Sequence, residues 1–177
     1  MIYNNKHVVF EQVGVEDTGY RWNSSTNTDS DGCFNNYEIS EMRNSVLNQT
    51  IISHLSNNLQ NELSSTTIQT VKNGKSSILV STTNKLFIPA SKEVGYTTYS
   101  ISAENNALIT WQYYVSHTTT DEHKKYNSSS TPLRWWNRSA CPDVGGIKYV
   151  CGVNQLGSAT TLDTTDSTRY VSCCFAW

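Results

Sequence analysis

The side chains that could take part in the most kinds of chemistry are five cysteines, in a sequence of 177 residues. They are Cys33, Cys141, Cys151, Cys173 and Cys174. Because their number is odd and no pair has C-x-x-C spacing, a zinc site is poorly supported. Cys173 and Cys174 are adjacent, and neighbours in a strand point to opposite faces, so these two are not placed to serve one site. We therefore expect free thiols and no bound metal.

The acidic loop between residues 27 and 38 is a second chemical candidate. Asn27, Asp29, Asp31, Gly32 and Glu38 occupy positions 1, 3, 5, 6 and 12 of a calcium-binding EF-hand loop. However, Asn27 stands where such loops carry Asp, and no helix is expected before it. A solvated turn accounts for the same residues. We therefore predict no tight calcium binding at this loop.

The histidines give no sign of a catalytic arrangement. They are scattered along the chain, at His7, His54, His117 and His123. Their spacing does not pair a nucleophile with a base. We therefore expect that the chain is not an enzyme and that it uses no cofactor.

The segment Trp135–Arg138 combines two tryptophans with an arginine. Side chains alternate in a strand, so one tryptophan is expected in the core while the other lines a binding groove. Arg138 shares a face with Trp136. Two roles for Arg138 stay open: contact with a ligand carboxylate or an aromatic ring, or burial against backbone carbonyls beneath the loops.

Composition excludes several classes of partner. Charged residues make up 16% of the chain, the formal net charge is −2, and no basic stripe is visible, which argues against nucleic-acid binding. No stretch of 18 apolar residues exists, so no membrane span is expected. Residues 1–10 lack the pattern of a signal peptide, and we expect synthesis in the cytoplasm. Five Trp and ten Tyr are typical of a binding surface or of a β-rich core.

Apolar residues at helical spacing predict two amphipathic helices, at about 38–47 and 50–63. The run Asn48-Gln49-Thr50 separates them, and Thr50 is the expected N-cap of the second helix. Residues 95–131 lack periodicity and predict long ordered loops with short strands. The helices are expected to pack on a small, twisted antiparallel sheet that includes residues 133–138, 147–153 and 169–177.

Strands are expected in two parts of the chain. Near the start, residues 7–15 alternate, and the runs 67–71 and 77–80 flank the hairpin dipeptide Asn73-Gly74. A further strand at 85–88 is expected to end at Pro89. The last four predicted strands are 133–138, 147–153, 158–162 and 169–177. The mixed faces of 147–153 predict one partly solvated face in an antiparallel sheet.

Segments along most of the chain carry a family resemblance. Trp135-Trp136-Asn137-Arg138-Ser139-Ala140 is similar to the motif W-W-L-R-S-P, with Asn137 in place of Leu and Ala140 in place of Pro. Segments 7–11, 37–43, 85–96, 151–159 and 175–177 match in order, whereas Val171-Ser172-Cys173 departs from the usual V-R-P. Together they resemble a domain family of unknown function from phage, prophage and bacterial surface proteins.

The resemblance implies a single domain over residues 1–177 with an α+β, C-type-lectin-like fold of the formylglycine-generating-enzyme type. In that fold, proteins diversified by retroelements carry their variable residues in the C-terminal strands and loops. Residues 133–177 are therefore the expected variable-type surface. The ligand-binding residues that the resemblance and the aromatic and polar side chains there imply are Trp136, Asn137, Arg138, Asp143, Val144, Ile147, Lys148, Tyr149, Asn154, Gln155, Arg169 and Tyr170.

The expected function is that of a ligand- or receptor-binding display domain in a phage, prophage or diversified protein. Its expected partner is a protein or glycan on a host-cell or bacterial surface, reached after assembly into a particle or release from the cell. Two alternatives stay open. In one, the domain is a structural tail or decoration subunit whose surface packs against other particle subunits. In the other, it is a cryptic enzyme of the formylglycine-generating type.

Overall fold

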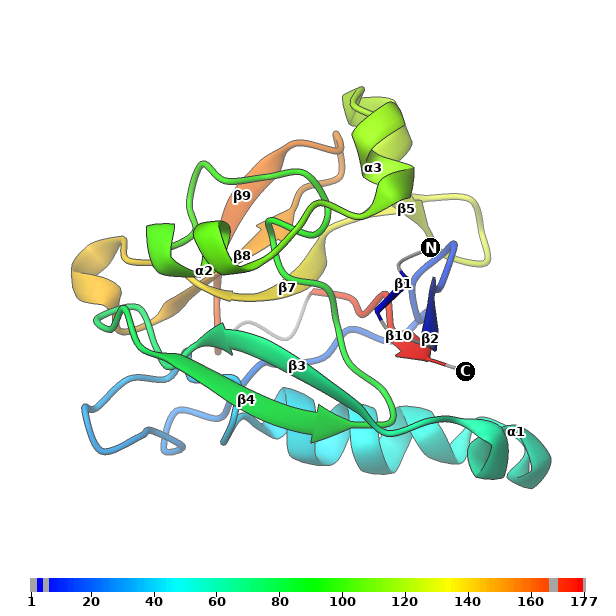
Figure 1. The fold of residues 1–177 in the computed structure, drawn as a ribbon, viewed down its shortest axis with the longest axis horizontal. Coiled ribbons are helices and arrows are strands. Elements are labelled where there is room, and N and C mark those ends of the chain that lie inside the picture. Colours follow the sequence, from blue (N-terminus) through cyan, green and yellow to red (C-terminus); the bar gives the residue numbers. More distant parts are fainter. Residues whose placement is uncertain (1–2, 5–6, 166–168, 177) are drawn as a thin grey trace.

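A computed structural model describes residues 3–4, 7–165 and 169–176 of the chain. Within this part the chain has an α+β fold, with short helices and small antiparallel sheets around an apolar core (Figure 1). No helix in the described ranges has the length and apolar character of a membrane span. The expected α+β class is confirmed in general terms, and its details differ in several places.

The described strands form four separate sheets, and all of their pairings are antiparallel. One sheet is the meander of β7 (Trp135–Ala140), β8 (Tyr149–Val153) and β9 (Ala159–Asp163). A second contains β1 (Tyr3–Asn4), β2 (His7–Glu11) and β10 (Cys174–Ala176). The two hairpins are β3 (Thr66–Val71) with β4 (Leu79–Asn84), and β5 (Lys125–Tyr126) with β6 (Pro132–Leu133).

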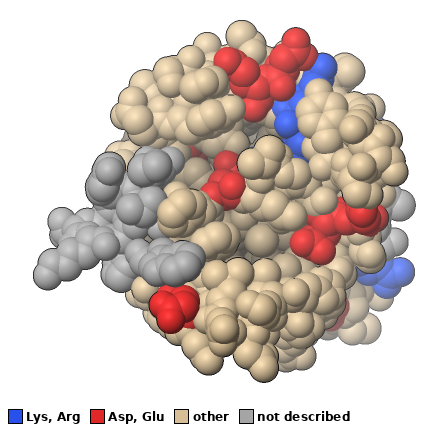
Figure 2. Space-filling view, turned by 90° about the vertical axis from the view of Figure 1, so that its right-hand side faces the viewer, with Lys and Arg blue, Asp and Glu red and all other residues tan. Residues whose placement is uncertain are grey.

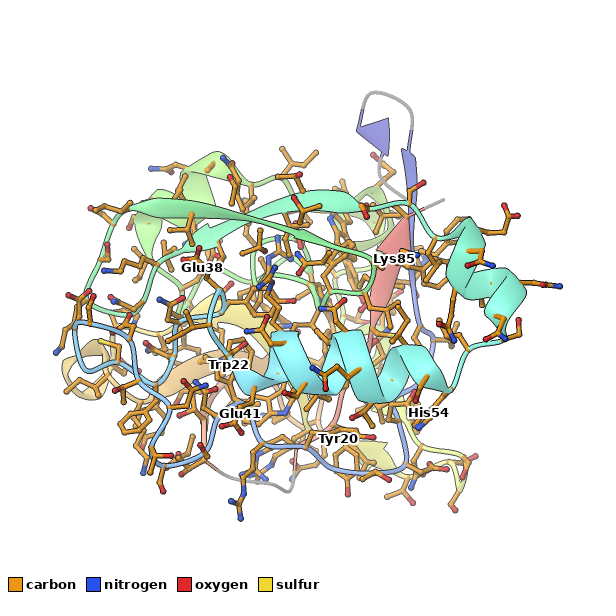
Figure 3. All side chains as sticks on the ribbon, turned by 90° about the horizontal axis from the view of Figure 1, so that it is seen from below. Tyr20, Trp22, Glu38, Glu41, His54 and Lys85 are labelled. Atoms are coloured by element: carbon orange, nitrogen blue, oxygen red, sulfur yellow. The ribbon has the colours of Figure 1, made fainter. Side chains whose placement is uncertain are left out.

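The longest helix, η1, lies beneath the β3–β4 hairpin, where Figure 1 draws it in cyan. It contributes Met42, Leu47 and Ile51 to the core. At its N-terminal end, the N–H of Met42 donates to the carbonyl of Trp22 at 2.9 Å. Figure 3 labels Trp22 near the start of this helix. The helices are η1 (Met42–Ile51), α1 (Asn57–Glu62), α2 (Ser102–Ala107), α3 (Gln112–Ser116), η2 (Thr120–His123) and η3 (Val144–Gly146).

The predicted helix boundaries are wrong between residues 38 and 63. The run at 48–50 does not break η1, because the side-chain amide of Asn48 donates to the carbonyl of Arg43 at 2.6 Å and stays within the helix. Ile52 also donates to the carbonyl five residues back, as in a π-helix. The break comes later, where Ser56 caps α1 by accepting the N–H of Leu59 at 3.3 Å. Thr50 is therefore not a cap.

The last strand does not join the meander, which corrects the prediction of one sheet that includes 169–177. β10 pairs with β2 on one edge, with Phe175 opposite Phe10. On its other edge Cys174 forms a bridge with Phe87. The two ends of the described chain therefore lie side by side (Figure 1).

The hairpin around Asn73-Gly74 is confirmed, since β3 and β4 pair along their whole lengths. The predicted strand at 85–88 is wrong, because β4 already ends at Asn84 and Phe87 then makes a single bridge. Residues 95–131 contain the short helices α2, α3 and η2 besides β5, whereas the sequence predicts only loops and short strands there.

β8 is the central strand of its sheet, and the predicted solvated face is absent from it. Residues 150–153 are all buried. A Cβ atom at Gly152 would collide with the side chain of Leu162 and the carbonyl of Trp135, so the neighbours pack directly onto its backbone. Glycine is therefore required at this position.

Both tryptophans of β7 are core residues, which corrects the prediction that one lines a groove. Trp136 packs on Trp22, with ring centroids 5.9 Å apart, and its indole N–H donates to the carbonyl of Tyr20 at 3.0 Å. On the other face of the strand, Trp135 donates to the carbonyl of His123 at 3.2 Å. Loops cover both faces of β7, so alternation cannot bring either ring to the surface.

We predict that Trp135→Ala and Trp136→Ala each lower the free energy of unfolding by roughly 3–5 kcal/mol, because each leaves a large cavity and frees a buried acceptor. Denaturant unfolding followed by circular dichroism measures the loss. Val13→Ala is the matched control, since Val13 is 89% exposed and its truncation should change stability by less than about 0.5 kcal/mol. A tryptophan variant as stable as this control would contradict the assignment.

Candidate ligand-binding surface

Three residues predicted to bind a ligand lie in the core instead. Trp136 and Asn137 are 0% exposed and Arg138 is 1% exposed. All six residues of β7 are buried, because other segments pack on both of its faces. The prediction that these three residues contact a ligand is therefore wrong, and the alternative role of Arg138, burial against backbone carbonyls, is confirmed.

The guanidinium group of Arg138 forms a buried ion pair with Glu93. Its Nη1 and Nη2 atoms lie 2.6 and 2.7 Å from the two carboxylate oxygens, which is bidentate geometry. The group also donates to the carbonyl of Ile88 at 2.9 Å, and to the carbonyl of Gln69 at 3.3 and 3.2 Å. Arg138 thus ties β7 to β3 and to the segment before Glu93, and every one of its donors is in use.

A second carboxyl group lies close to this ion pair, on α2. Glu104 is 0% exposed, and its Oε1 accepts the hydroxyl of Thr70 at 2.8 Å. Burial raises the pKa of Glu104, although the charge of Arg138 opposes the effect. The neutral form is therefore favoured more than for an ordinary glutamate, and Glu93 is the principal counter-ion of Arg138.

The exposed residues of the predicted set lie at opposite ends of β8. Residues 143–148 belong to the loop before the strand and Tyr149 is the first residue of the strand, whereas Asn154 and Gln155 belong to the turn after it. A strand of five residues extends about 17 Å. The predicted set therefore divides into two separate surfaces.

The loop before β8 is fixed by one buried side chain, that of Asn35. Asn35 is 0% exposed, and its Nδ2 lies 2.8 Å from the carbonyl oxygen of Tyr149, 3.2 Å from that of Gly146 and 3.4 Å from that of Cys141. Its Oδ1 accepts the N–H of Gly74 at 3.2 Å. One carboxamide therefore joins both ends of the loop to the turn of the β3–β4 hairpin.

Backbone contact strengthens this attachment. A Cβ atom at Gly74 would collide with the carbonyl oxygens of Cys141 and Gly146, and a Cβ atom at Gly146 would collide with the backbone of Gly74. Gly146 also has a φ of 69°, a conformation that favours glycine. Phe34 adds a third attachment, because its N–H donates to the carbonyl of Ile147 at 2.8 Å. The loop is held by its own backbone on three sides.

We use the name loop surface for Asp143, Ile147, Lys148, Tyr149 and Asp163. Asp143 is exposed, and the other four side chains are half-buried. The Nζ of Lys148 lies 2.7 Å from a carboxylate oxygen of Asp163, and this contact raises the pKa of Lys148. Tyr149 lies opposite Asp163 in the β8–β9 pairing. The surface thus presents one aromatic ring, one apolar side chain and charges of both signs.

The turn after β8 has a different composition. Asn154 mainly builds the turn, because its Oδ1 accepts the N–H groups of Leu156 and Ser158 at 2.9 and 3.1 Å. Gln155 is exposed, and its Oε1 accepts a hydrogen bond from Nε of Arg134 at 2.8 Å. The tip of the turn is Leu156, which is 64% exposed and which sequence reasoning missed. The sequence indicated Leu156 only as an apolar residue among turn-forming residues.

The last members of the predicted set support the core. The backbone of Tyr170 accepts the N–H of Trp136 and donates to the carbonyl of Arg134, both at 3.0 Å. Arg169 accepts the N–H of Tyr20 through its carbonyl at 2.7 Å. The side chains of both are half-buried. Val144 begins η3, but its side chain lies outside the described residues.

Both carboxylate oxygens of Asp29, in the candidate calcium loop, already accept hydrogen bonds. Asp29 accepts the N–H groups of Asp31 and Cys33 through Oδ1, at 2.9 and 3.0 Å. Its Oδ2 accepts the amides of Asn36 and Asn73, at 3.1 and 2.8 Å. Burial alone would raise the pKa of Asp29, but these hydrogen bonds hold it below the usual range. Asp29 therefore orders the loop and ties it to the β3–β4 turn.

A further cleft among the described residues lies away from the predicted binding residues. It has a volume of about 640 Å³ and separates β3 from the segment 107–111. Gln69 and Thr67 contribute to its polar wall, and Phe87, Leu108 and Trp111 to its apolar wall. None of the predicted binding residues whose side chains the structure describes lines it. The cleft is therefore a second place at which a ligand is to be sought.

Comparison with known proteins identifies a family without a known activity. A family model described as Domain of unknown function (DUF6273) matches residues 10–176. The chain therefore belongs to this family. No curated protein and no solved structure matches the chain.

We predict that Asp29→Ala destabilises the domain by about 2 kcal/mol or more, because it leaves buried amide donors without an acceptor. We also predict that calcium neither binds tightly nor raises the melting temperature, since the carboxylate already has four protein donors. Differential scanning calorimetry with and without calcium measures both effects. The account is contradicted by a calcium-dependent rise in the melting temperature that disappears in the variant.

Proposed function

We propose that this member of the DUF6273 family is a non-enzymatic ligand-binding domain that displays the loop surface to a protein or glycan on a cell surface. The observation that supports the proposal is the attachment of the loop by Asn35 and Gly74. A loop that is ordered before its ligand arrives loses little conformational entropy on binding. Recognition at this surface needs no covalent step.

The chemistry of the loop surface suits a polar partner with apolar patches. Tyr149 offers a rigid amphipathic ring, and Lys148 and Asp163 offer a donor and an acceptor at its side. The β3–β4 turn lies against the loop and adds Lys75 and Ile78, both exposed. In Figure 1 the two segments meet at the left end of the molecule, away from both chain ends.

The biological setting forms a further part of the proposal. The motif at 135–140 and the matching segments in order support a C-type-lectin-like domain of a phage, prophage or retroelement-diversified protein. In such a protein the loop surface would vary while the scaffold stays constant. The burial of residues 135–140 agrees with this division, because side chains of the motif support the loop rather than contact a partner.

A structural subunit of a particle is the second candidate function, and the opposite end of the molecule favours it. Figure 2 shows that end, which is mostly uncharged with patches of acidic side chains. Phe10, Val13, Tyr113 and Val115 are 41, 89, 46 and 55% exposed there. Apolar side chains at such exposure are typical of a surface that packs against a neighbour.

We predict that Tyr149→Ala weakens ligand binding by roughly 30-fold or more, as expected for a central aromatic residue. Tyr149→Ala should lower the free energy of unfolding by less than a core variant does, since the ring of Tyr149 is only half-buried. The measurement is adsorption of the folded, labelled domain to a panel of bacterial cells and to a glycan array. The melting temperature of each variant is measured separately. Lys148→Ala should act in the same direction with a smaller effect.

Matched controls distinguish the candidate sites. Gln155→Ala tests the turn after β8, Gln69→Ala tests the cleft, and Val115→Ala tests the opposite end of the molecule. Each variant should bind normally if the loop surface is the binding site. Loss of binding in one of these folded controls, with normal binding by Tyr149→Ala, would move the site there. Unfolding of Tyr149→Ala and Lys148→Ala would show that they are structural residues.

A further inference from the structure

Two buried cysteines lie at the base of the loop before β8, one directly after β7 and one within β8. Cys141 follows the end of β7, and its N–H donates to the carbonyl of Tyr149 at 2.9 Å. Ala140 pairs with Val150 one position earlier, so Cys141 and Cys151 lie diagonally across the two strands. Both side chains lie on the same face of the sheet, and each thiol is near enough to the other to shift its pKa. Both residues are free cysteines, 0% and 1% exposed.

The two sulfurs have different surroundings. The Sγ of Cys141 also accepts the backbone N–H of Asp143 at 3.4 Å, and the exposed residues of the loop follow it directly. The neighbouring thiol of Cys151 lowers the pKa of Cys141, whereas Cys141 and burial raise the pKa of Cys151 well above its usual value. Cys141 is therefore the better nucleophile, and Cys151 is its proton-bearing neighbour.

We propose that Cys141 and Cys151 form a redox-sensitive dithiol that a small hydroperoxide converts to a disulfide, which closes the loop that carries the loop surface. The strand pairing brings the side chains of Cys141 and Cys151 to the same face of the sheet. Cys173 and Cys174 are instead neighbours in sequence, and only Cys174 belongs to a strand, β10. The proposal concerns this chemistry alone and does not depend on the ligand.

The reaction proceeds in two steps with hydrogen peroxide as the oxidant. The thiolate of Cys141 attacks one peroxide oxygen, the O–O bond breaks, and the leaving hydroxide takes up a proton to give water and a sulfenic acid. Cys151 then loses its proton, and its sulfur attacks the sulfur of Cys141. The S–O bond breaks, the S–S bond forms and a second water leaves. Two thiols thus lose two electrons and two protons, and one peroxide becomes two waters.

The remaining cysteines provide internal controls. Burial raises the pKa of Cys173 to about 12 and that of Cys174 well above its usual value. Burial also raises the pKa of Cys33. All three should therefore react more slowly with peroxide than Cys141.

The test treats the full chain with hydrogen peroxide, alkylates the remaining thiols after denaturation, and maps the cysteines by mass spectrometry. We expect a peptide pair cross-linked between Cys141 and Cys151, reversed by a reducing agent, with the other three cysteines alkylated. In Cys151→Ser the cross-link should be absent, and a sulfenic-acid reagent should label Cys141. The melting temperature should rise on oxidation of the wild type and not of this variant.

Two results would overturn the proposal. One is a wild-type chain in which Cys33, Cys173 or Cys174 is oxidised before any bond between Cys141 and Cys151 forms. The other is a chain in which all five cysteines remain open to alkylation after peroxide treatment. Both results are read on the wild type, so they stand even if Cys151→Ser does not fold, and Cys151→Ala is available as a second variant.

Discussion

The fold depends on the burial of one ion pair, that of Arg138 with Glu93. Removal of two charges from water costs several kcal/mol per ion, and it is tolerated only where the remaining donors find acceptors. Here the carbonyls of Gln69 and Ile88 supply them. The three segments that meet at Arg138 are thereby fixed relative to one another. β7 can then run through the core and deliver the loop that follows it at a defined position.

Asn35 has a similar role at the loop before β8. Like Arg138, it satisfies backbone groups of distant segments with a single buried side chain. The order of the loop surface thus rests on backbone atoms, and its exposed side chains are free to differ without loss of the fold. This separation of support from contact is the physical basis of the proposed display function. The thiols of Cys141 and Cys151 lie at the same junction, where a covalent bond would add to the attachment.

Sequence reasoning succeeded where the signal is local and failed where it is not. The β3–β4 hairpin follows from its turn residues, and β7, β8 and β9 follow as separate strands from short apolar runs, whereas their meander does not. The burial of Trp136 and Arg138 does not follow from local signals, because side-chain alternation does not reveal which segments cover the two faces of a strand. The acceptors of Arg138 lie about 50 and 69 residues away in sequence. Asn35 was one amide in a polar loop, and no pattern distinguishes it.

The most direct test of the central claim is amide hydrogen exchange across residues 141–149 in the wild type and in Asn35→Ala, combined with cell adsorption of both. We expect the amides of Cys141 and Gly146 to exchange roughly tenfold faster or more in the variant, because the loop opens more readily once its carbonyls lose the hydrogen bonds from Asn35. The amide of Trp136 should keep its protection. Binding should weaken although no exposed side chain has changed. Unchanged exchange in the loop together with unchanged adsorption would contradict the account.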